Sequence, residues 1–193
     1  MAKMSKKAEM GMGTLIIFIA MILVAAIAAA VLISTTSSLQ SKALETGSAT
    51  RQEVGTSLSV IEITAEDGSV GESVDNFTVL LRLAAGSDPI RFEDTLLSFN
   101  LNDDSRDYRY NDDAECGNVS GTDFAVEYAI NGTDHRDGYL VPGDVSQVCF
   151  AAPRAVSEGE KFRLTLTPRV GAPANVETTL PGLLITQRVK VFP

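Results

Sequence analysis

The sequence predicts an α+β protein in which a long hydrophobic N-terminal α-helix precedes an antiparallel β-sandwich. Two observations support this fold class. Leu15–Ile33 is an uninterrupted run of 19 apolar residues, and no charged residue occurs from Met10 to Ser41. After Gly55, short apolar or alternating segments follow one another, separated by clusters of Gly, Asp, Asn and Pro. The length of 193 residues is sufficient for about one domain with an appendage.

The apolar run reaches the length of about 18 residues that a membrane-spanning helix needs. Eight of its residues are β-branched and six are alanine, and such branched and small side chains let neighbouring helices pack closely. Because the helix is apolar on every face, it can be buried on every face, by lipid or by identical helices. We expect its large side chains to form this packing surface: Leu15, Ile16, Ile17, Phe18, Ile19, Met21, Ile22, Leu23, Val24, Ile27, Val31, Leu32 and Ile33.

We expect the helix to continue beyond the apolar run and to end near Gly55. Residues 34–53 are polar but contain no proline, and Leu39, Ala43 and Leu44 supply a thin apolar stripe. A helix from residue 9 to residue 55 would be roughly 70 Å long at about 1.5 Å per residue. The rest of the chain is too small to cover that length, so other molecules must cover much of it.

Seven segments after Gly55 predict β-strands, because they alternate apolar and polar residues or are continuously apolar. Short strands with regular turn signals between them favour an antiparallel sandwich of immunoglobulin-like type. The predicted strands are residues 57–65, 75–84, 95–102, 123–130, 145–152, 161–168 and 183–192.

The residues before the apolar run indicate how the N-terminus is processed, and several interpretations are possible. An ordinary secretory signal has an apolar region of about 7–15 residues followed by an A-x-A-like cleavage site. The stretch AAIAAAVLIS offers small residues, but the run is too long for such a signal. A plain membrane anchor is a second possibility, in which Lys3, Lys6 and Lys7 would remain cytoplasmic and everything after Ile33 would lie outside.

A third interpretation comes from the stretch KKAEMGMGTLIIFIAMILVAAIAAAVLISTTSSLQSKA. It resembles, nearly residue for residue, the start of the archaeal flagellins (archaellins), a family related to type IV pilins. In that family a prepilin-type peptidase removes a basic leader just before the apolar segment, after a basic residue and a glycine. In this sequence Lys7, preceded by Lys6, takes the basic place, Ala8 takes the glycine place, and Glu9 becomes the first mature residue. Ala8 departs from the family pattern.

The resemblance implies a structural subunit of the archaeal motility filament, the archaellum. It implies a cleaved leader (residues 1–8), a polymerisation helix (9–55) and an outer β-sandwich (56–193). Further copies or related archaellins, the prepilin-type peptidase, and the membrane platform and assembly ATPase of the filament are the expected partners. The subunit would sit in the cytoplasmic membrane before assembly and in an extracellular filament afterwards. An adhesive type IV-like pilin and a monomeric membrane-anchored binding module are the alternatives.

Composition and motifs argue against other function classes. The formal net charge of −9 opposes nucleic-acid binding, which needs basic surfaces. The sequence contains no G-x-S-x-G elbow, P-loop or H-E-x-x-H motif, so we expect neither an enzyme nor a cofactor. The single histidine, His135, excludes an imidazole metal cluster within one chain and is predicted to lie in an exposed turn.

The part of the chain after the helix contains candidate covalent modifications. Cys116 and Cys149 are the only cysteines, and an oxidising exterior predicts a disulfide worth about 3–4 kcal/mol, with two buried thiols as the alternative. Three sequons place N-glycosylation candidates at Asn76, Asn118 and Asn131. Asn118 and Asn131 lie in turn-like sequence and rank above Asn76, and the archaellin resemblance strengthens the prediction of a glycoprotein.

An acidic stretch, LNDDSRDYRYNDDAEC, could supply oxygen ligands for a structural Ca²⁺ or Mg²⁺ ion. The spacing of an EF-hand is absent, so a solvated acidic loop is the favoured interpretation. The candidate ligands are Asp103, Asp104, Asp107, Asp112 and Asp113.

Overall fold

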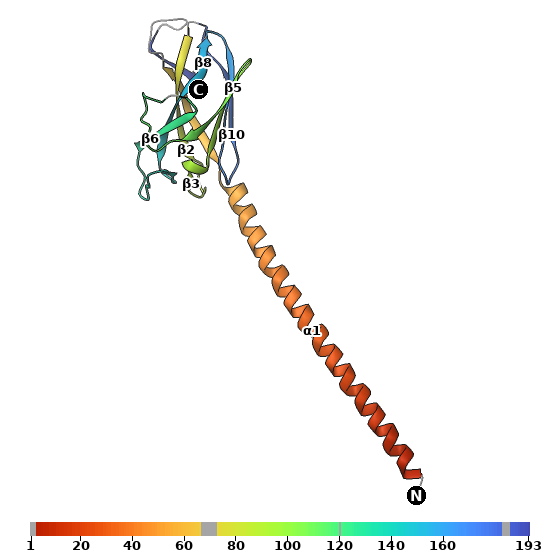
Figure 1. The fold of residues 1–193 in the computed structure, drawn as a ribbon. Helices are drawn as coiled ribbons and strands as arrows, with labels where there is room; N and C mark the ends of the chain where they lie inside the picture. The colour runs from red at the N-terminus through yellow and green to blue at the C-terminus, as the bar shows by residue number, and fades with distance from the viewer. Residues whose placement is uncertain (1–2, 67–72, 120, 183–185) are drawn as a thin grey trace. The chain divides into compact units, whose positions relative to one another are not determined.

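A computed structural model describes residues 3–66, 73–119, 121–182 and 186–193, with side chains from Met10 onward. The chain divides into two compact units, Met1–Ala49 and Thr50–Pro193. The first is helical, and the second, called the outer unit below, contains the strands (Figure 1). This confirms the predicted order of a long apolar helix followed by a largely antiparallel β-domain.

Helix α1 (Lys3–Gly55) is a single helix of 53 residues. It begins inside the predicted leader and ends at Gly55, where the sequence places the stop. Hydroxyl side chains border the apolar run and bond back to the helix: Thr14 Oγ1 donates to Gly11 O (3.0 Å), and Thr35 Oγ1 donates to Val31 O (2.9 Å). These hydroxyl groups therefore donate their hydrogen bonds without water, which suits a helix that is surrounded by lipid or by other apolar helices.

Among the described residues, nine strands form one hydrogen-bonded sheet in the order β10-β9-β4-β5-β6-β8-β2-β1-β11, and two more form a small ribbon, β3-β7. All neighbouring strands pair antiparallel except β5 and β6, which pair in parallel. The bounds are β1 (Leu58–Glu66), β2 (Ser73–Leu83), β3 (Ile90–Arg91), β4 (Leu96–Leu101), β5 (Ser105–Tyr110), β6 (Asp123–Ile130), β7 (Tyr139–Leu140), β8 (Val145–Ser157), β9 (Lys161–Thr167), β10 (Ala174–Thr179) and β11 (Arg188–Phe192). A 3-10 turn, η1 (Phe92–Asp94), precedes β4.

The sheet folds onto itself around a core of aromatic rings. Phe77 of β2 packs against Phe99 of β4 and Phe162 of β9, with ring centroids 5.0 and 5.2 Å apart. Phe150 of β8 stacks on Phe77 at 5.7 Å. Since β2 and β8 belong to one half of the sheet and β4 and β9 to the other, these contacts join two facing layers, as a sandwich requires.

The two ends of the strand order also approach one another. Thr178 Oγ1 of β10 donates to the carbonyl oxygen of Val191 on β11, at 3.0 Å. The edge strands of the sheet are therefore side by side.

Several strands were not predicted. β5 and β10 each bury a single large side chain, Tyr108 and Val176, among largely charged or polar neighbours. β8 continues beyond the predicted end at residue 152 to Ser157. Of the predicted last strand, residues 183–185 lie outside the described residues, and β11 occupies Arg188–Phe192.

Thr56, the residue that directly follows α1, is hydrogen-bonded within the outer unit. The Ala172 N–H donates to Thr56 O (2.9 Å), and the Asp88 N–H donates to Thr56 Oγ1 (3.2 Å). Gly171 has φ +113°, and a Cβ atom there would lie 2.7 Å from Thr56 O. Glycine at this position therefore allows the 169–172 turn to close on the end of the helix.

Candidate assembly helix and outer-unit sites

The helix presents an apolar surface that nothing within its own unit covers. The thirteen large side chains predicted to form the packing surface are between 49% and 71% exposed. One helix in the described part of the chain, Met10–Gly55, is long and apolar enough to cross a membrane. Contiguous apolar surface of this extent marks a contact with lipid or with other protein.

The leader residues Lys6, Lys7, Ala8 and Glu9 belong to the backbone of α1. Their side chains lie outside the described part of the structure. The predicted cleavage before Glu9 therefore stays a prediction.

The two cysteines form a disulfide. Cys116, in the loop between β5 and β6, is bonded to Cys149 on β8, with the Cα atoms 5.4 Å apart. The Cys116 N–H also donates to Glu127 Oε1 on β6 (3.1 Å), and Thr78 Oγ1 of β2 lies 3.8 Å from Cys149 Sγ. The disulfide therefore fastens the loop around Cys116 to β8, and the hydrogen bond to Glu127 fastens it to β6.

The three glycosylation candidates differ in their surroundings. Asn76, Asn118 and Asn131 are all exposed. Asn76 lies within strand β2, and Thr78, the hydroxyl residue of its sequon, is buried beside the disulfide. Asn131 directly follows β6, and its sequon residue Thr133 is exposed. In the folded chain, the Asn131 sequon is thus more accessible to a modifying enzyme than the Asn76 sequon.

The carboxylates of the acidic stretch do not gather at one point in the structure. β5 separates Asp103 and Asp104 from Asp112 and Asp113 by six residues, which corresponds to about 20 Å along an extended strand. Asp107 accepts a hydrogen bond from Ser98 (2.6 Å). In the described residues, no group of three or more His, Cys, Asp or Glu side chains could hold a metal ion. The proximity of these carboxylates in sequence is lost because the strand between them is extended.

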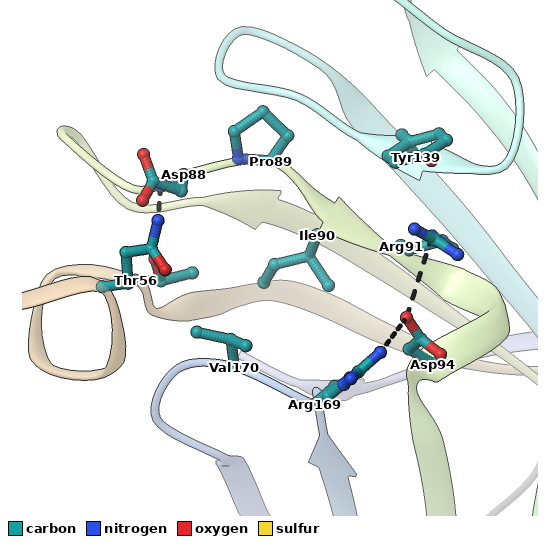
Figure 2. A pocket seen from close by; sticks show the side chains of 10 residues that line it. Thr56, Asp88, Pro89, Ile90, Arg91, Asp94, Tyr139, Arg169 and Val170 are labelled. Carbon is teal, nitrogen blue, oxygen red and sulfur yellow. Dashed lines mark hydrogen bonds and ion pairs between the residues drawn. The ribbon is translucent and has the colours of Figure 1, made fainter. Parts of the chain in front are cut away.

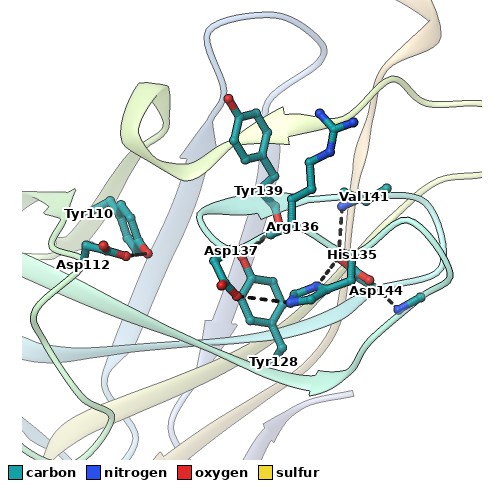
Figure 3. A network of polar contacts seen from close by, with 10 residues as sticks. Tyr110, Asp112, Tyr128, His135, Arg136, Asp137, Tyr139, Val141 and Asp144 are labelled. Atoms are coloured by element: carbon teal, nitrogen blue, oxygen red, sulfur yellow. Dashed lines mark hydrogen bonds and ion pairs between the residues drawn. The ribbon is translucent and has the colours of Figure 1, made fainter.

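His135 is not in a freely exposed turn, which corrects the prediction. Its Nδ1 lies 3.1 Å from Asp144 Oδ2 and its Nε2 lies 3.3 Å from Asp137 Oδ1, so Figure 3 shows the imidazole between two carboxylates. Its ring packs edge-on against Tyr128 at 4.3 Å. The Tyr128 hydroxyl donates to Tyr139 O (2.8 Å). These contacts tie residues 131–144 to strand β6.

Asp144 is the buried centre of this network. Its side chain is 0% exposed and also accepts the Gly132 N–H (2.6 Å) and the Val141 N–H (3.4 Å). Burial raises the pKa of this carboxyl, but the hydrogen bonds from Gly132, His135 and Val141 outweigh it and hold the pKa below its usual range. A Cβ atom on Gly132 would lie 3.0 Å from Asp144 Oδ1, so glycine allows this close approach.

The hydrogen bond to Asp144 raises the pKa of His135 above its usual value of about 6.5, and burial opposes this shift only in part. Protonated His135 thus stabilises the fold below about pH 6.5, and this contribution is lost as pH rises through the raised pKa. We therefore expect wild type to lose melting temperature between pH 5.5 and pH 8.5 relative to His135→Gln. Melting curves of both proteins at the two pH values test this. Equal pH dependence in the two proteins would contradict it.

A helix with apolar side chains exposed on all sides, joined to a disulfide-linked β-domain, defines a class of structural subunits whose helix is covered by lipid or by other helices. Comparison with known proteins specifies the family. The sequence model of archaeal-type flagellins matches residues 8–178, and the chain belongs to this family. It is accordingly a structural protein and not an enzyme.

Individual relatives agree over nearly the whole length. The chain is 30% identical to flagellin B1 of Methanococcus voltae, with 97% of this chain and 96% of that protein covered. It is 32% identical to flagellin B2 of Methanocaldococcus jannaschii, with coverages of 95% and 94%.

Two solved structures share the fold. The archaeal flagellum of Methanospirillum hungatei matches with a TM-score of 0.70 and 18% identity, over 95% of this chain and 99% of that chain. Crystalline flagellin FlaB1 of M. jannaschii matches with a TM-score of 0.60 and 18% identity, over 70% and 96% of the two chains.

Proposed function

We propose that the protein is a subunit of an archaeal motility filament, an extracellular polymer that it forms with copies of itself or with related archaellins. The observation that carries this proposal is the exposed apolar surface of α1 on a member of the archaeal-type flagellin family. Packing against other helices would remove this surface from water at a gain of about 25 cal/mol per Å². The outer unit, with its acidic surface, would face the medium.

The same surface suits the subunit before assembly. We propose that α1 first lies in the cytoplasmic membrane, where lipid covers its apolar side chains. A prepilin-type peptidase would then cut between Ala8 and Glu9, removing the leader with its lysines. Removal of these three lysines would change the formal net charge from −9 to −12. The membrane platform and assembly ATPase would move the mature chain, helix 9–55 and sandwich 56–193, into the filament.

Glycans on the outer unit complete the proposal. Asn131 is the foremost acceptor, since it and its sequon threonine are exposed at the end of β6. Asn118 lies on the loop that the disulfide fastens, and Asn76 lies within β2. Modification of Asn76 would therefore have to precede the folding of that strand.

Two alternatives remain distinct from this function. An adhesive type IV-like pilin would share the helix and the processing, so loss of motility on deletion separates it from a motility filament. A monomeric membrane-anchored module would keep its N-terminus and would not polymerise.

N-terminal sequencing and intact mass of material that sediments from the culture medium test the proposal. We expect sedimenting filaments whose subunit begins at Glu9 and whose mass exceeds that of the polypeptide by the mass of attached glycan. A chain that begins at Met1 or Ala2 and stays in the membrane fraction would refute assembly. A mass equal to the bare polypeptide would refute glycosylation alone.

A further inference from the structure

A pocket of about 550 Å³ lies in the outer unit beside the last turn of α1. We call it the arginine pocket and define it by Ile90, Arg91, Asp94, Tyr139, Arg169 and Val170. Gln52 and Thr56, at the end of the helix, also line it.

Two arginines in the pocket share one carboxylate. Asp94 Oδ2 lies 3.7 Å from Arg91 Nε and 3.6 Å from Arg169 Nη1 (Figure 2). Arg91 also stacks over the Tyr139 ring at 5.5 Å, which holds its guanidinium in place, and it lies 3.9 Å from the exposed Glu93. The Arg169 side chain is 73% exposed. This end of the pocket therefore presents a positive side chain that a further carboxylate can approach.

Other arginines of the outer unit differ from this arrangement. Arg163 lies 2.8 Å from Glu177, and Arg188 pairs with Glu66, each with a carboxylate that no second arginine shares among the described ion pairs. Asp88 also lines the arginine pocket, but Figure 2 shows it at the end away from Arg91 and Arg169.

The outer unit as a whole is strongly acidic. Residues 50–193 contain 12 Lys and Arg against 23 Asp and Glu. Neighbouring copies therefore repel one another unless positive groups meet negative ones across the contact. The largely exposed Arg169 side chain of the arginine pocket supplies one such positive group.

The matching negative feature lies at the opposite end of the same strand. β4 (Leu96–Leu101) starts just after Asp94 and leads into a tight turn, Asn102–Asp104, which we call the acidic turn. Its Asp103 side chain is 84% exposed, with Arg154 at 3.7 Å, and Asp104 is exposed as well. Six residues of strand correspond to about 20 Å, so the acidic turn cannot reach the arginine pocket of its own chain.

We propose that the arginine pocket of one copy binds the acidic turn of a second copy, with Asp104 paired to Arg169. The two surfaces differ and lie at opposite ends of β4, so the contact is head-to-tail. A contact of this kind leaves a free surface at each end and generates an open filament when the rotation between copies does not close into a ring, whereas a self-complementary contact stops at a dimer. The proposal rests on the proposed function, because it places a second contact in the same filament.

Charge reversal in assembled filaments tests the proposal. We expect Arg169→Glu and Asp104→Arg each to raise the fraction of subunit that stays in the supernatant after mild shear, by about fivefold or more. The double variant should return toward wild type, because the reversed pair is again complementary. Lys161→Glu, which makes the same charge change as Arg169→Glu at an exposed site on β9, is the matched control for that variant. Single variants that equal this control, or a double variant that is no better than the singles, would overturn the pairing.

Cross-linking provides a measurement that does not depend on stability. Filaments of a chain with both Arg169→Cys and Asp104→Cys are treated with a short bismaleimide. A ladder of dimers, trimers and higher species is expected, and each single variant should give none. Absence of the ladder in filaments that sediment normally would refute the pairing and leave the proposed function intact. A wild-type chain that never sediments would refute the proposed function itself.

Discussion

Ile22→Lys is expected to abolish the filament. Ile22 lies in the middle of the apolar run, and its neighbours in the polymer would be other apolar helices. A lysine at the centre of such a helix costs about 3 kcal/mol in an apolar environment. That penalty corresponds to a loss of more than about a hundredfold in the affinity of each subunit for the filament. Sedimentation of the culture medium should therefore yield no polymer.

Two controls separate assembly from other effects of the substitution. Ile22→Leu keeps the apolar volume, and we expect normal filaments. Ser41→Lys adds the same charge in the polar half of α1, and we expect little loss. The amount of each variant in the membrane fraction shows whether insertion has failed instead. Filaments of Ile22→Lys as abundant as those of Ser41→Lys would show that the helix surface is not the packing surface.

Replacing both cysteines by serine should lower the free energy of unfolding of the outer unit by about 3–4 kcal/mol. The disulfide closes a segment with a sequence separation of 33 residues, and it fastens the 111–122 loop to the sheet. For a domain of this size, the melting temperature should fall by about 10 °C. Thermal unfolding of the full-length chain in detergent, followed by circular dichroism, measures the change.

The reductant control uses the same two proteins. Dithiothreitol should lower the melting temperature of wild type to that of the Cys116→Ser/Cys149→Ser variant and leave the variant unchanged. A wild-type melting temperature that resists complete reduction would show that the loop is held by its other contacts alone, such as the bond from Cys116 N–H to Glu127.

The helix and most of the sheet could be predicted because their signals are local. A long apolar run, a polar stretch without proline and Gly55 as the stop determine α1, and alternating side chains determine strands such as β2 and β9. β5 escaped prediction because only Tyr108 of its six side chains is fully buried among charged residues. The ribbon of β3 and β7 consists of two-residue strands that pair residues 90–91 with residues 139–140, a contact without a local pattern.

Contacts that form only in the tertiary structure could not be predicted from the sequence. Nothing in the sequence near His135 indicates that Asp144, nine residues later, is buried and bonded to it. Asp94 and Arg169 meet although 75 positions separate them. The acidic stretch shows the opposite case, since residues close in sequence suggested a common site and an extended strand keeps them apart.

The meeting of β10 and β11 has a consequence for a crowded polymer. An open edge strand is a template for pairing with the sheet of another molecule, which leads to irreversible aggregation. Many outer units would be held at high local concentration around one filament. Because the Thr178 hydroxyl of β10 donates to the carbonyl oxygen of Val191 on β11, the two edge strands lie against each other, and each covers part of the other. We therefore expect neighbouring subunits to touch without pairing their sheets, so that contacts in the outer layer of the filament stay reversible.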